Sequence, residues 1–258
     1  MLNFKSVTIT TSVIFIGLLV IFLIKPLSIW WFVLLFFIWF ILTALGSGLV
    51  GWNYHIKILN AHKNAPKNHI AITFDDGPNP EFTPQVLALL NTYQAKATFF
   101  CIGKHIENHP DLFKQIIAEG HTIGNHTYSH ANTFGFFKTK KVQAELEKTK
   151  SIIKQYSGLN SNLYRPAFGV TNPRISRAVQ NLNLTTIGWN KRSLDTTNLT
   201  EEQILKRTTK NLKSGDVILL HDTSEKSVRV LEQLLLFLRD NNFQSVTIDT
   251  LFNTQAYA

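Results

Sequence analysis

Cysteine is nearly missing from this chain, since Cys101 is the only one among 258 residues. An intrachain disulfide is therefore excluded, and the redox compartment is left open. Cys101 lies in the apolar run 97–103, which is typical of a buried strand. We expect it to pack as a small buried hydrophobe, with a catalytic nucleophile as the alternative.

Acidic residues are missing from the first part of the chain, where none precedes Asp75. Two uncharged apolar segments, 7–24 and 27–51, flank the dipeptide Lys25-Pro26. The second exceeds the roughly 20 residues that span a bilayer, and both are apolar on all sides. We predict that residues 1–54 form a transmembrane hairpin in a bacterial-type cell membrane. A cleaved signal peptide competes for the first segment, without a small-residue cleavage site; a buried soluble hairpin is the other alternative.

Positive charge is unevenly placed along the chain. Five lysines and no acids precede Asp75, whereas the remaining 21 basic residues face 17 acidic ones. The basic balance therefore does not call for nucleic acid as a partner. Residues 55–68 are expected to form a basic linker beside the lipid bilayer. The lysine distribution favours a cytoplasmic catalytic domain.

From residue 69 to 252 apolar strand-like runs alternate with helical patterns. Alternation of this kind is typical of a mainly parallel sheet covered by helices. We expect seven strands, near 69–74, 97–101, 121–124, 163–164, 185–189, 217–220 and 245–248. Seven strands rather than eight predict an incomplete (β/α)7 barrel, an α/β fold. Unusual polar residues follow several of these strands, and barrel enzymes place their active sites at that rim.

Two adjacent carboxylates, Asp75 and Asp76, end the first of these strands before Gly77-Pro78. Like charges side by side repel unless a cation or a proton lies between them. One carboxylate could then bind a metal while the other handles protons. The alternative is a solvated Asp-Asp-Gly-Pro turn.

Two histidines, His126 and His130, are four residues apart. If this segment turns helically, both imidazoles face the same way and can hold one cation. Together with Asp76 they would form a two-histidine, one-carboxylate set with open positions. Satisfied or exposed histidines are the alternative.

Arg165 and His221 each follow an apolar run. Arg165 can hold a carboxylate ionised and oriented, or it can be a solvated arginine before a loop. His221 can act as a general acid, because its reference pKa of about 6.5 is near neutrality. A histidine bonded to Asp222 at the edge of the core is the alternative reading.

These motifs resemble the polysaccharide deacetylases of carbohydrate esterase family 4, which share the NodB homology domain. The resemblance covers residues 69–250, with Thr73–Pro78, His126–His130, Arg165–Gly169 and Leu219–His221 in the order of the family motifs. It implies that Asp75 is the base and Arg165 orients it. It also implies a metal, most simply Zn and otherwise Co, Mn, Ni or Fe, on Asp76, His126 and His130.

The remaining implied roles concern the acid and the substrate. The resemblance makes His221 the acid, the backbone N–H of Phe168 an oxyanion donor, and Leu219 part of the acetyl pocket. The family commonly has Asp-x-x-Asp-Trp after a strand tryptophan. Here Trp189 is followed by Arg192 in the first Asp position and Thr196 in the Trp position, so that only Asp195 is kept.

The family resemblance implies a hydrolase that removes the N-acetyl group from amino sugars of a polysaccharide, oligosaccharide or glycan precursor. Two alternatives stay open. One is a deformylase or deacetylase of a lipid-linked amino sugar, which suits the hairpin. The other is a catalytically inactive glycan-binding homologue, which suits the substitutions at Arg192 and Thr196.

Overall fold

A curled sheet of parallel strands forms the centre of the computed structural model, which describes residues 2–258. The strand order is β1-β6-β5-β4-β3-β2-β8-β7, and β9 also pairs with β2. The strands are β1 (Ile58–Leu59), β2 (His69–Asp75), β3 (Ala97–Cys101), β4 (Thr122–Asn125), β5 (Leu163–Tyr164), β6 (Thr185–Ile187), β7 (Lys191–Arg192), β8 (Val217–His221) and β9 (Gln244–Ser245). Within the described residues β1 and β7 are the two open edges, so the barrel is incomplete, as predicted.

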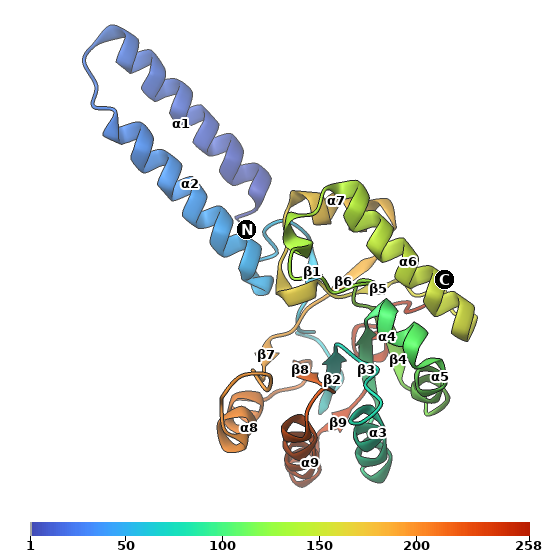
Figure 1. The fold of residues 1–258 in the computed structure, drawn as a ribbon. Helices are drawn as coiled ribbons and strands as arrows, with labels where there is room; N and C mark the ends of the chain where they lie inside the picture. The colour runs from blue at the N-terminus through green and yellow to red at the C-terminus, as the bar shows by residue number, and fades with distance from the viewer. Residues whose placement is uncertain (1) are drawn as a thin grey trace.

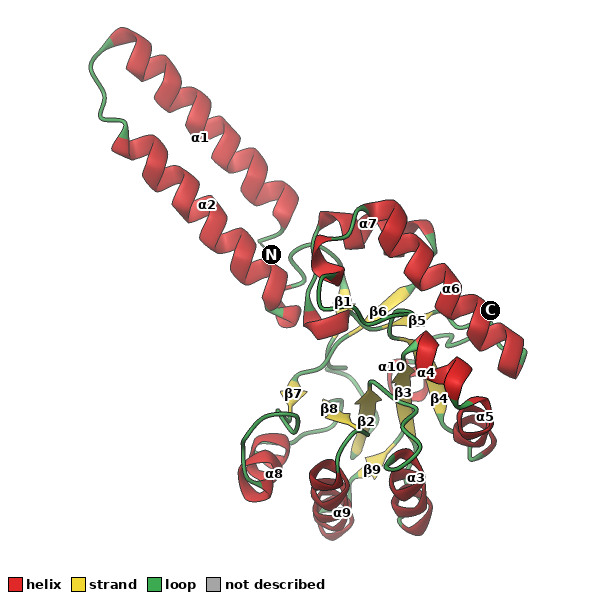
Figure 2. Cartoon of the chain, viewed as in Figure 1, coloured by secondary structure: helices red, strands yellow, loops and turns green. Residues whose placement is uncertain are grey.

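Helices cover the outside of the sheet, and an apolar hairpin projects away from it (Figures 1 and 2). The α-helices are α1 (Phe4–Ile24), α2 (Trp30–Gly48), α3 (Thr83–Thr92), α4 (Gly103–Asn108), α5 (Pro110–Ala118), α6 (Thr139–Ser157), α7 (Pro173–Asn181), α8 (Glu201–Thr209), α9 (Glu225–Asp240) and α10 (Ile248–Phe252). Three short 3-10 helices are η1 (Val50–Trp52), η2 (Phe134–Phe136) and η3 (Ala167–Gly169).

Strands β2 and β3 are apolar along their length because both of their faces are covered. One face packs against α3, α5 and α9 in the main core, where Ile72, Phe74 and Phe99 are at most 1 % exposed. The other faces the barrel interior, where Ala71 and Phe100 join a second apolar cluster. Cys101 is fully buried in the main core, as expected of a small hydrophobe.

Several segments differ from the sequence-based prediction. Residues 245–248 do not form a strand: β9 is only Gln244–Ser245, and α10 begins at Ile248, whose N–H donates to Thr98 Oγ1. Residues 55–68, for which a basic linker is predicted, contain β1, which pairs with β6. Strands β1 and β7 have two residues each, which is too short for the alternation of apolar and polar residues that predicts a strand. Helix α4 was also not anticipated.

The hairpin consists of two helices that are long and apolar enough to cross a membrane, with mean hydropathies of 2.7 and 2.1. Only 6 % of each apolar window is buried, and a signal sequence would share this length and composition. Helix α1 begins before the predicted Val7, because the Asn3 side chain forms a capping box with Ser6. Between the helices, Trp39 Nε1 donates to Thr8 Oγ1 at 3.2 Å.

The base of the hairpin packs directly against the rest of the protein. The ring of Tyr54, which is 3 % exposed, lies over Gly46, where a Cβ would collide with it. The Phe4 N–H donates to the Tyr54 carbonyl at 2.9 Å. The Thr171 N–H donates to the Ser47 carbonyl at 2.9 Å. The end of α2 is therefore attached to the loop that follows η3.

Candidate active site

The carboxyl ends of β2, β4, β5 and β8 bring the predicted polar residues to one rim. Parallel pairing sets Asp75 of β2 beside His221 of β8, and Asn125 of β4 beside Tyr164 of β5. His126 and Arg165 each come one residue later. This register explains how residues nearly 150 positions apart in the chain meet at one site.

Asp76, His126 and His130 form a compact cluster of candidate metal ligands. Asp76 Oδ1 lies 3.4 Å from Nε2 of each histidine, and the three candidate ligand atoms are within 4.8 Å of one another. The helical turn that the spacing allows does not form in this segment. Thr127 and His130 have φ of 68° and 46°, so that a left-handed loop rather than a helix aims both rings at Asp76.

The hydrogen bonds around this cluster leave lone pairs facing one another. His126 Nδ1 lies 3.0 Å from the Arg165 carbonyl, which can only accept, so Nδ1 carries the hydrogen. In its neutral form, the one that binds metals, His126 therefore presents the Nε2 lone pair to Asp76 Oδ1. That oxygen is buried and has no hydrogen-bond partner among the described residues. A cation between these atoms would relieve the repulsion, and the donor set is one that binds Zn and similar ions.

Electrostatics at the cluster also favour positive charge. Burial alone would raise the pKa of Asp76, but the positive charge of His126, followed by that of His130 and His221, outweighs burial and lowers that pKa. Burial likewise lowers the pKa of His126, but Asp75 and Asp76 outweigh it and raise that pKa, so a proton or a metal ion is favoured between these groups. Burial, and then the charge of His126, lower the pKa of His130 to about 4. The carboxylate is thus ionised and His130 neutral near pH 7, which are the forms in which both side chains bind metals.

Asp75 lies beside the cluster and is held by Arg165. The Arg165 Nη1 donates to Asp75 Oδ1 at 2.8 Å and to Thr73 Oγ1 at 2.7 Å, and Nη2 donates to the Gly188 carbonyl at 2.9 Å. Arg165 is fully buried and Asp75 is 3 % exposed. The arginine is therefore no solvated loop residue. It fixes Asp75 with Oδ2 at 3.8 Å from His126 Nε2.

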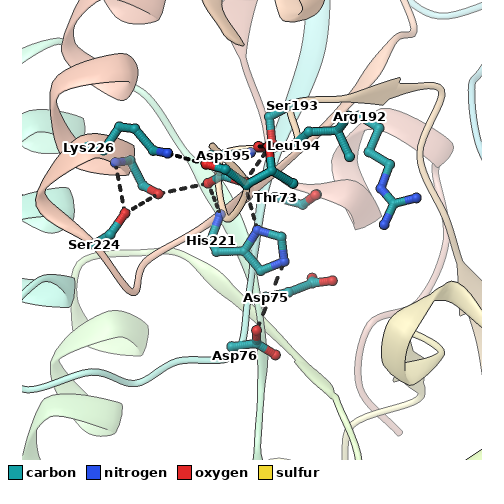
Figure 3. Close-up of polar contacts among 12 residues, drawn as sticks. Thr73, Asp75, Asp76, Arg192, Ser193, Leu194, Asp195, His221, Ser224 and Lys226 are labelled. Atoms are coloured by element: carbon teal, nitrogen blue, oxygen red, sulfur yellow. Dashed lines mark hydrogen bonds and ion pairs between the residues drawn. The ribbon is translucent and has the colours of Figure 1, made fainter. Parts of the chain in front are cut away.

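His221 is held by Asp195, which lies deep in the same site (Figure 3). Asp195 Oδ1 accepts from the His221 ring Nδ1 at 2.8 Å, and Oδ2 accepts from the His221 backbone N–H at 2.8 Å. The other ring nitrogen, Nε2, lies 4.0 Å from Asp76 Oδ2. Burial would lower the pKa of His221, but the hydrogen bond and charge of Asp195 outweigh burial and raise it to about 9.

The same geometry corrects one reading of His221 and adds residues that the sequence did not indicate. His221 does not bond to Asp222, whose carboxylate accepts instead from Thr83 Oγ1. Ser193 Oγ donates to Asp195 Oδ1 at 2.7 Å, and Ser227 Oγ donates to Oδ2 at 2.9 Å. Serine at a loop position or in the first turn of a helix is common for local reasons, so no signal marked either residue.

Phe168 forms one wall of the open space above the cluster. Its backbone is left-handed, with φ 57°, which is uncommon for a residue other than glycine and concentrates at functional sites. The turn is closed by the N–H groups of Gly169 and Val170, so it does not use the Phe168 N–H. The Phe168 ring is 48 % exposed and lies 4.3 Å from the His130 ring, centroid to centroid.

All these groups meet in a cavity of about 250 Å³. It is lined by the carboxylates and imidazoles described above and by Phe168, Gly169, Trp189, Arg192, Leu194, Thr196, Thr197 and Leu219. Nearly all the predicted site residues therefore reach one space. Asp195 and Arg165 lie behind its surface, where they hold His221 and Asp75. A carboxylate base, an imidazolium acid and a three-ligand metal cluster on one cavity can carry out hydrolysis of an amide.

Comparison with known proteins agrees with this chemistry. The family profile of polysaccharide deacetylase matches residues 62–187. A peptidoglycan-N-acetylglucosamine deacetylase of Bacillus cereus is 36 % identical over 187 residues, which cover 70 % of this chain and 87 % of that protein. The chain belongs to the polysaccharide deacetylase family. It is accordingly a hydrolase of N-acetyl amides on carbohydrate, as the sequence motifs predicted.

Other members of the polysaccharide deacetylase family are similar at lower identity. A chitooligosaccharide deacetylase of Sinorhizobium fredii is 27 % identical over 187 residues, or 67 % of this chain and 87 % of that protein. The crystal structure of the Bc1960 peptidoglycan N-acetylglucosamine deacetylase, in complex with an N-hydroxybenzamide compound, superposes with a TM-score of 0.72 at 31 % identity. That match covers 78 % of this chain and 94 % of the other. The fold of the family thus extends over nearly all of the chain beyond the hairpin.

Proposed function

We propose that this deacetylase is membrane-anchored and metal-dependent, and that it removes the N-acetyl group from amino-sugar residues of a polysaccharide, oligosaccharide or glycan precursor. The observation that carries the proposal is the cluster of candidate metal ligands, Asp76, His126 and His130, directly beside Asp75. The similarity to peptidoglycan and chitooligosaccharide deacetylases supports the substrate class. The catalytic domain would comprise residues 69–252, with β1 added to its sheet from residues 55–68.

The metal would be held by Asp76 Oδ1 and by Nε2 of His126 and His130. Zn is the first choice for two imidazoles and a carboxylate, and Co, Mn, Ni or Fe suit the same donors. When bound there, such an ion would polarise the acyl carbonyl and lower the pKa of water. The Arg165 carbonyl orients His126 from behind, as partners of metal-binding histidines commonly do.

Asp75 would act as the general base. Its Oδ1 is engaged by Arg165, which leaves Oδ2 directed to the cluster and able to take a proton from the attacking water. The buried guanidinium holds the carboxylate in one orientation. Of the two adjacent carboxylates, one thus binds the ion and the other handles the proton.

His221 would act as the general acid for the leaving amine. Asp195 holds the ring so that Nε2 faces the cavity. The raised pKa keeps this nitrogen protonated at neutral pH, ready to donate. The free N–H of Phe168 would stabilise the developing oxyanion, a contribution of about 3–4 kcal/mol for one well-placed donor. Leu219 would contact the acetyl methyl group, and Trp189, which is partly exposed in the cavity, would contact the sugar.

The membrane anchor rests on α1 and α2. Each is long enough to cross the roughly 30 Å hydrocarbon core, and both present large apolar side chains to their surroundings. A hairpin of two membrane-spanning helices would keep the N-terminus and the catalytic domain on one side, near the bilayer. This placement favours a glycan close to the membrane.

The direct test is acyl release by the full-length protein in detergent, with N-acetylglucosamine oligomers and added Zn or Co. Asp75→Asn keeps the size of the side chain and should retain bound metal while turnover falls by at least a hundredfold. Exposed Asp111→Asn serves as a matched control and should be fully active. Undiminished turnover by a metal-loaded Asp75→Asn protein would refute the role of Asp75.

Two other functions have specific observations in their favour. A deformylase or deacetylase of a lipid-linked amino sugar would suit a site attached to a membrane hairpin. A cytoplasmic position of Ala258, read from a topology reporter fused there, would favour it over action on the external wall. An inactive glycan-binding protein would suit Arg192 and Thr196, and metal binding without hydrolysis of any acylated amino sugar would support it.

A further inference from the structure

Arg192 lies at the end of β7 and lines the catalytic cavity. Its side chain is exposed, and among residues 2–258 no carboxylate, carbonyl or hydroxyl accepts a hydrogen bond from its guanidinium. Only its backbone carbonyl is used, as acceptor for Arg207 Nε at 3.3 Å. Figure 3 shows the Arg192 side chain directed away from the network around Asp195. Five donors on a permanent charge therefore remain free beside the reacting groups.

The cations near Arg192 in the chain and in the site do not line the cavity and are held by the protein. Lys191 Nζ contacts the carbonyls of residues 210 and 211 and the carboxylate of Asp216. Lys226 Nζ donates to the carbonyls of Thr197 and Leu199. Arg165 is buried behind Asp75. Among the described residues that line this cavity, Arg192 is therefore the only lysine or arginine, and its guanidinium has no protein partner there.

Packing on Trp189 does not account for this placement. The Arg192 Cζ lies 5.8 Å from the Trp189 ring, close to the outer limit of about 6 Å for a cation–π contact. The tryptophan instead borders the same cavity, where its ring offers a flat apolar surface next to the charge. A flat surface beside a free guanidinium is suited to a sugar ring that carries an anionic group.

We propose that Arg192 forms an anion subsite of the catalytic cavity, which binds a carboxylate or phosphate group carried by the substrate near the N-acetylated position. The inference rests on the proposed deacetylase function and specifies its substrate as an acidic amino-sugar glycan. A guanidinium can pair with either oxyanion through two parallel hydrogen bonds. A sugar carboxylate and a sugar phosphate share this chemistry, and the choice of substrates distinguishes them.

The test compares substrates with and without the charge, using the metal-loaded full-length protein. The neutral substrate is an N-acetylglucosamine oligomer. The carboxylated one alternates N-acetylglucosamine with N-acetylmuramic acid, and the phosphorylated one carries a 1-phosphate. Arg192→Gln should raise KM for an acidic substrate roughly 10- to 100-fold, as expected for lost hydrogen bonds to a charged group. Its kcat should change little, because binding of the anion is uniform through the reaction.

Matched variants separate recognition from a structural role. Arg192→Lys keeps the charge but cannot form the two parallel hydrogen bonds. Its KM for an acidic substrate should therefore lie between those of the wild type and Arg192→Gln. Exposed Arg177→Gln, on α7, removes the same charge away from the cavity and should leave every KM unchanged. Equal effects of Arg192→Gln on neutral and acidic substrates would overturn the subsite and leave the deacetylase function intact.

A failure of the deacetylase function would be visible separately. If the metal-loaded wild type hydrolysed none of the three substrates, the proposed function would fail. The subsite would then be tested by calorimetric binding of the same glycans. Tighter binding of an acidic glycan by wild type than by Arg192→Gln would support it, and equal binding would overturn it.

Discussion

Asp195 accepts hydrogen bonds from His221 with both of its carboxylate oxygens. Oδ1 accepts from the ring Nδ1 and Oδ2 accepts from the backbone N–H, each at 2.8 Å. The two contacts fix the imidazole at the end of β8 and determine which nitrogen faces the cavity. The arrangement survives although Arg192 and Thr196 replace two family residues around it. Asp195, the aspartate kept from the family's Asp-x-x-Asp-Trp pattern, therefore still positions the residue proposed as the acid.

The first prediction concerns the pH dependence of this pair. Asp195 raises the pKa of His221 to about 9, so the acid is protonated below that pH and activity should decline as pH rises through it. Asp195→Asn removes the negative charge, and the pKa should fall toward the ordinary value of about 6.5. We expect the alkaline limb of the kcat profile to move to lower pH by one or more units.

Ser193→Ala is the matched control for that profile. It removes one hydrogen bond to Asp195 Oδ1 and keeps both charges, so the alkaline limb should move by much less. An unchanged limb in Asp195→Asn would show that His221 is not the group that titrates.

The second prediction concerns metal removal. Extensive dialysis against a chelator should abolish turnover and lower Tm, and Zn or Co should restore both, because a ligand that binds the folded state stabilises it. At a metal concentration of 100 times Kd the gain is about 2.7 kcal/mol. The measurement is a thermal melt with metal content determined in parallel.

His126→Gln provides the variant for the metal experiment. It removes a ligand nitrogen, so the metal-dependent rise in Tm should be lost or greatly reduced. His62→Gln, at a histidine far from the cluster, should keep the full rise. A normal rise in His126→Gln would exclude this nitrogen as a ligand.

The third prediction concerns Asp222, which is fully buried beneath the site. Burial raises the pKa of its carboxyl to about 7, against about 3.9 in the unfolded chain. Between these values the folded state keeps a proton that the unfolded state has released. Stability should therefore fall as pH rises from about 4 to about 7, at most by about 1.4 kcal/mol per unit.

Asp222→Asn cannot release a proton and keeps an oxygen that can accept from Thr83. This variant should flatten the slope, and its advantage over wild type should be greatest above pH 7. Urea unfolding at several pH values measures the effect, with exposed Asp240→Asn as a control that keeps the wild-type slope. Parallel curves for wild type and Asp222→Asn would contradict the prediction.

The fourth prediction concerns the base of the hairpin. A Cβ on Gly46 would collide with the Tyr54 ring, whereas a Cβ on Gly48 would meet no atom within 4 Å. Gly46→Ala should therefore destabilise the junction by about 1–3 kcal/mol. Gly48→Ala should be neutral or slightly stabilising. Limited proteolysis of residues 49–57 compares the two variants, and equal cleavage rates would show that the contact carries little energy.

Much of the sheet and of the site could be predicted from local patterns. The run 70–74 is largely apolar because β2 is covered on both faces, and this pattern predicts a strand that ends at Asp75. Residues Val246 to Ile248 look like a continuation of a strand, yet the chain turns at Thr247 to begin α10. A local pattern cannot reveal this turn, because the Thr98 hydroxyl that receives the Ile248 N–H lies 150 residues away.

In the site as well, the sequence predicts which residues take part but not the backbone geometry that brings them together. The types and order of Asp76, His126 and His130 indicate a metal cluster, but their spacing suggested a helical turn that does not form. Thr127 donates its N–H to the Asn125 side chain and takes a left-handed conformation. His130 therefore reaches Asp76 because the backbone between the two histidines reverses direction. The four-residue spacing alone could not distinguish this loop from a helical turn.

The hydrogen bond from Thr171 to the Ser47 carbonyl joins the hairpin to the loop that carries Phe168, only three residues away. If α1 and α2 span a bilayer as proposed, the mouth of the cavity is held at one height above the lipid and in one orientation. Such an enzyme cannot search outward on a flexible tether. Its encounters with substrate would depend on sideways diffusion in the membrane plane, so that the density of glycan at that height would limit the rate of modification.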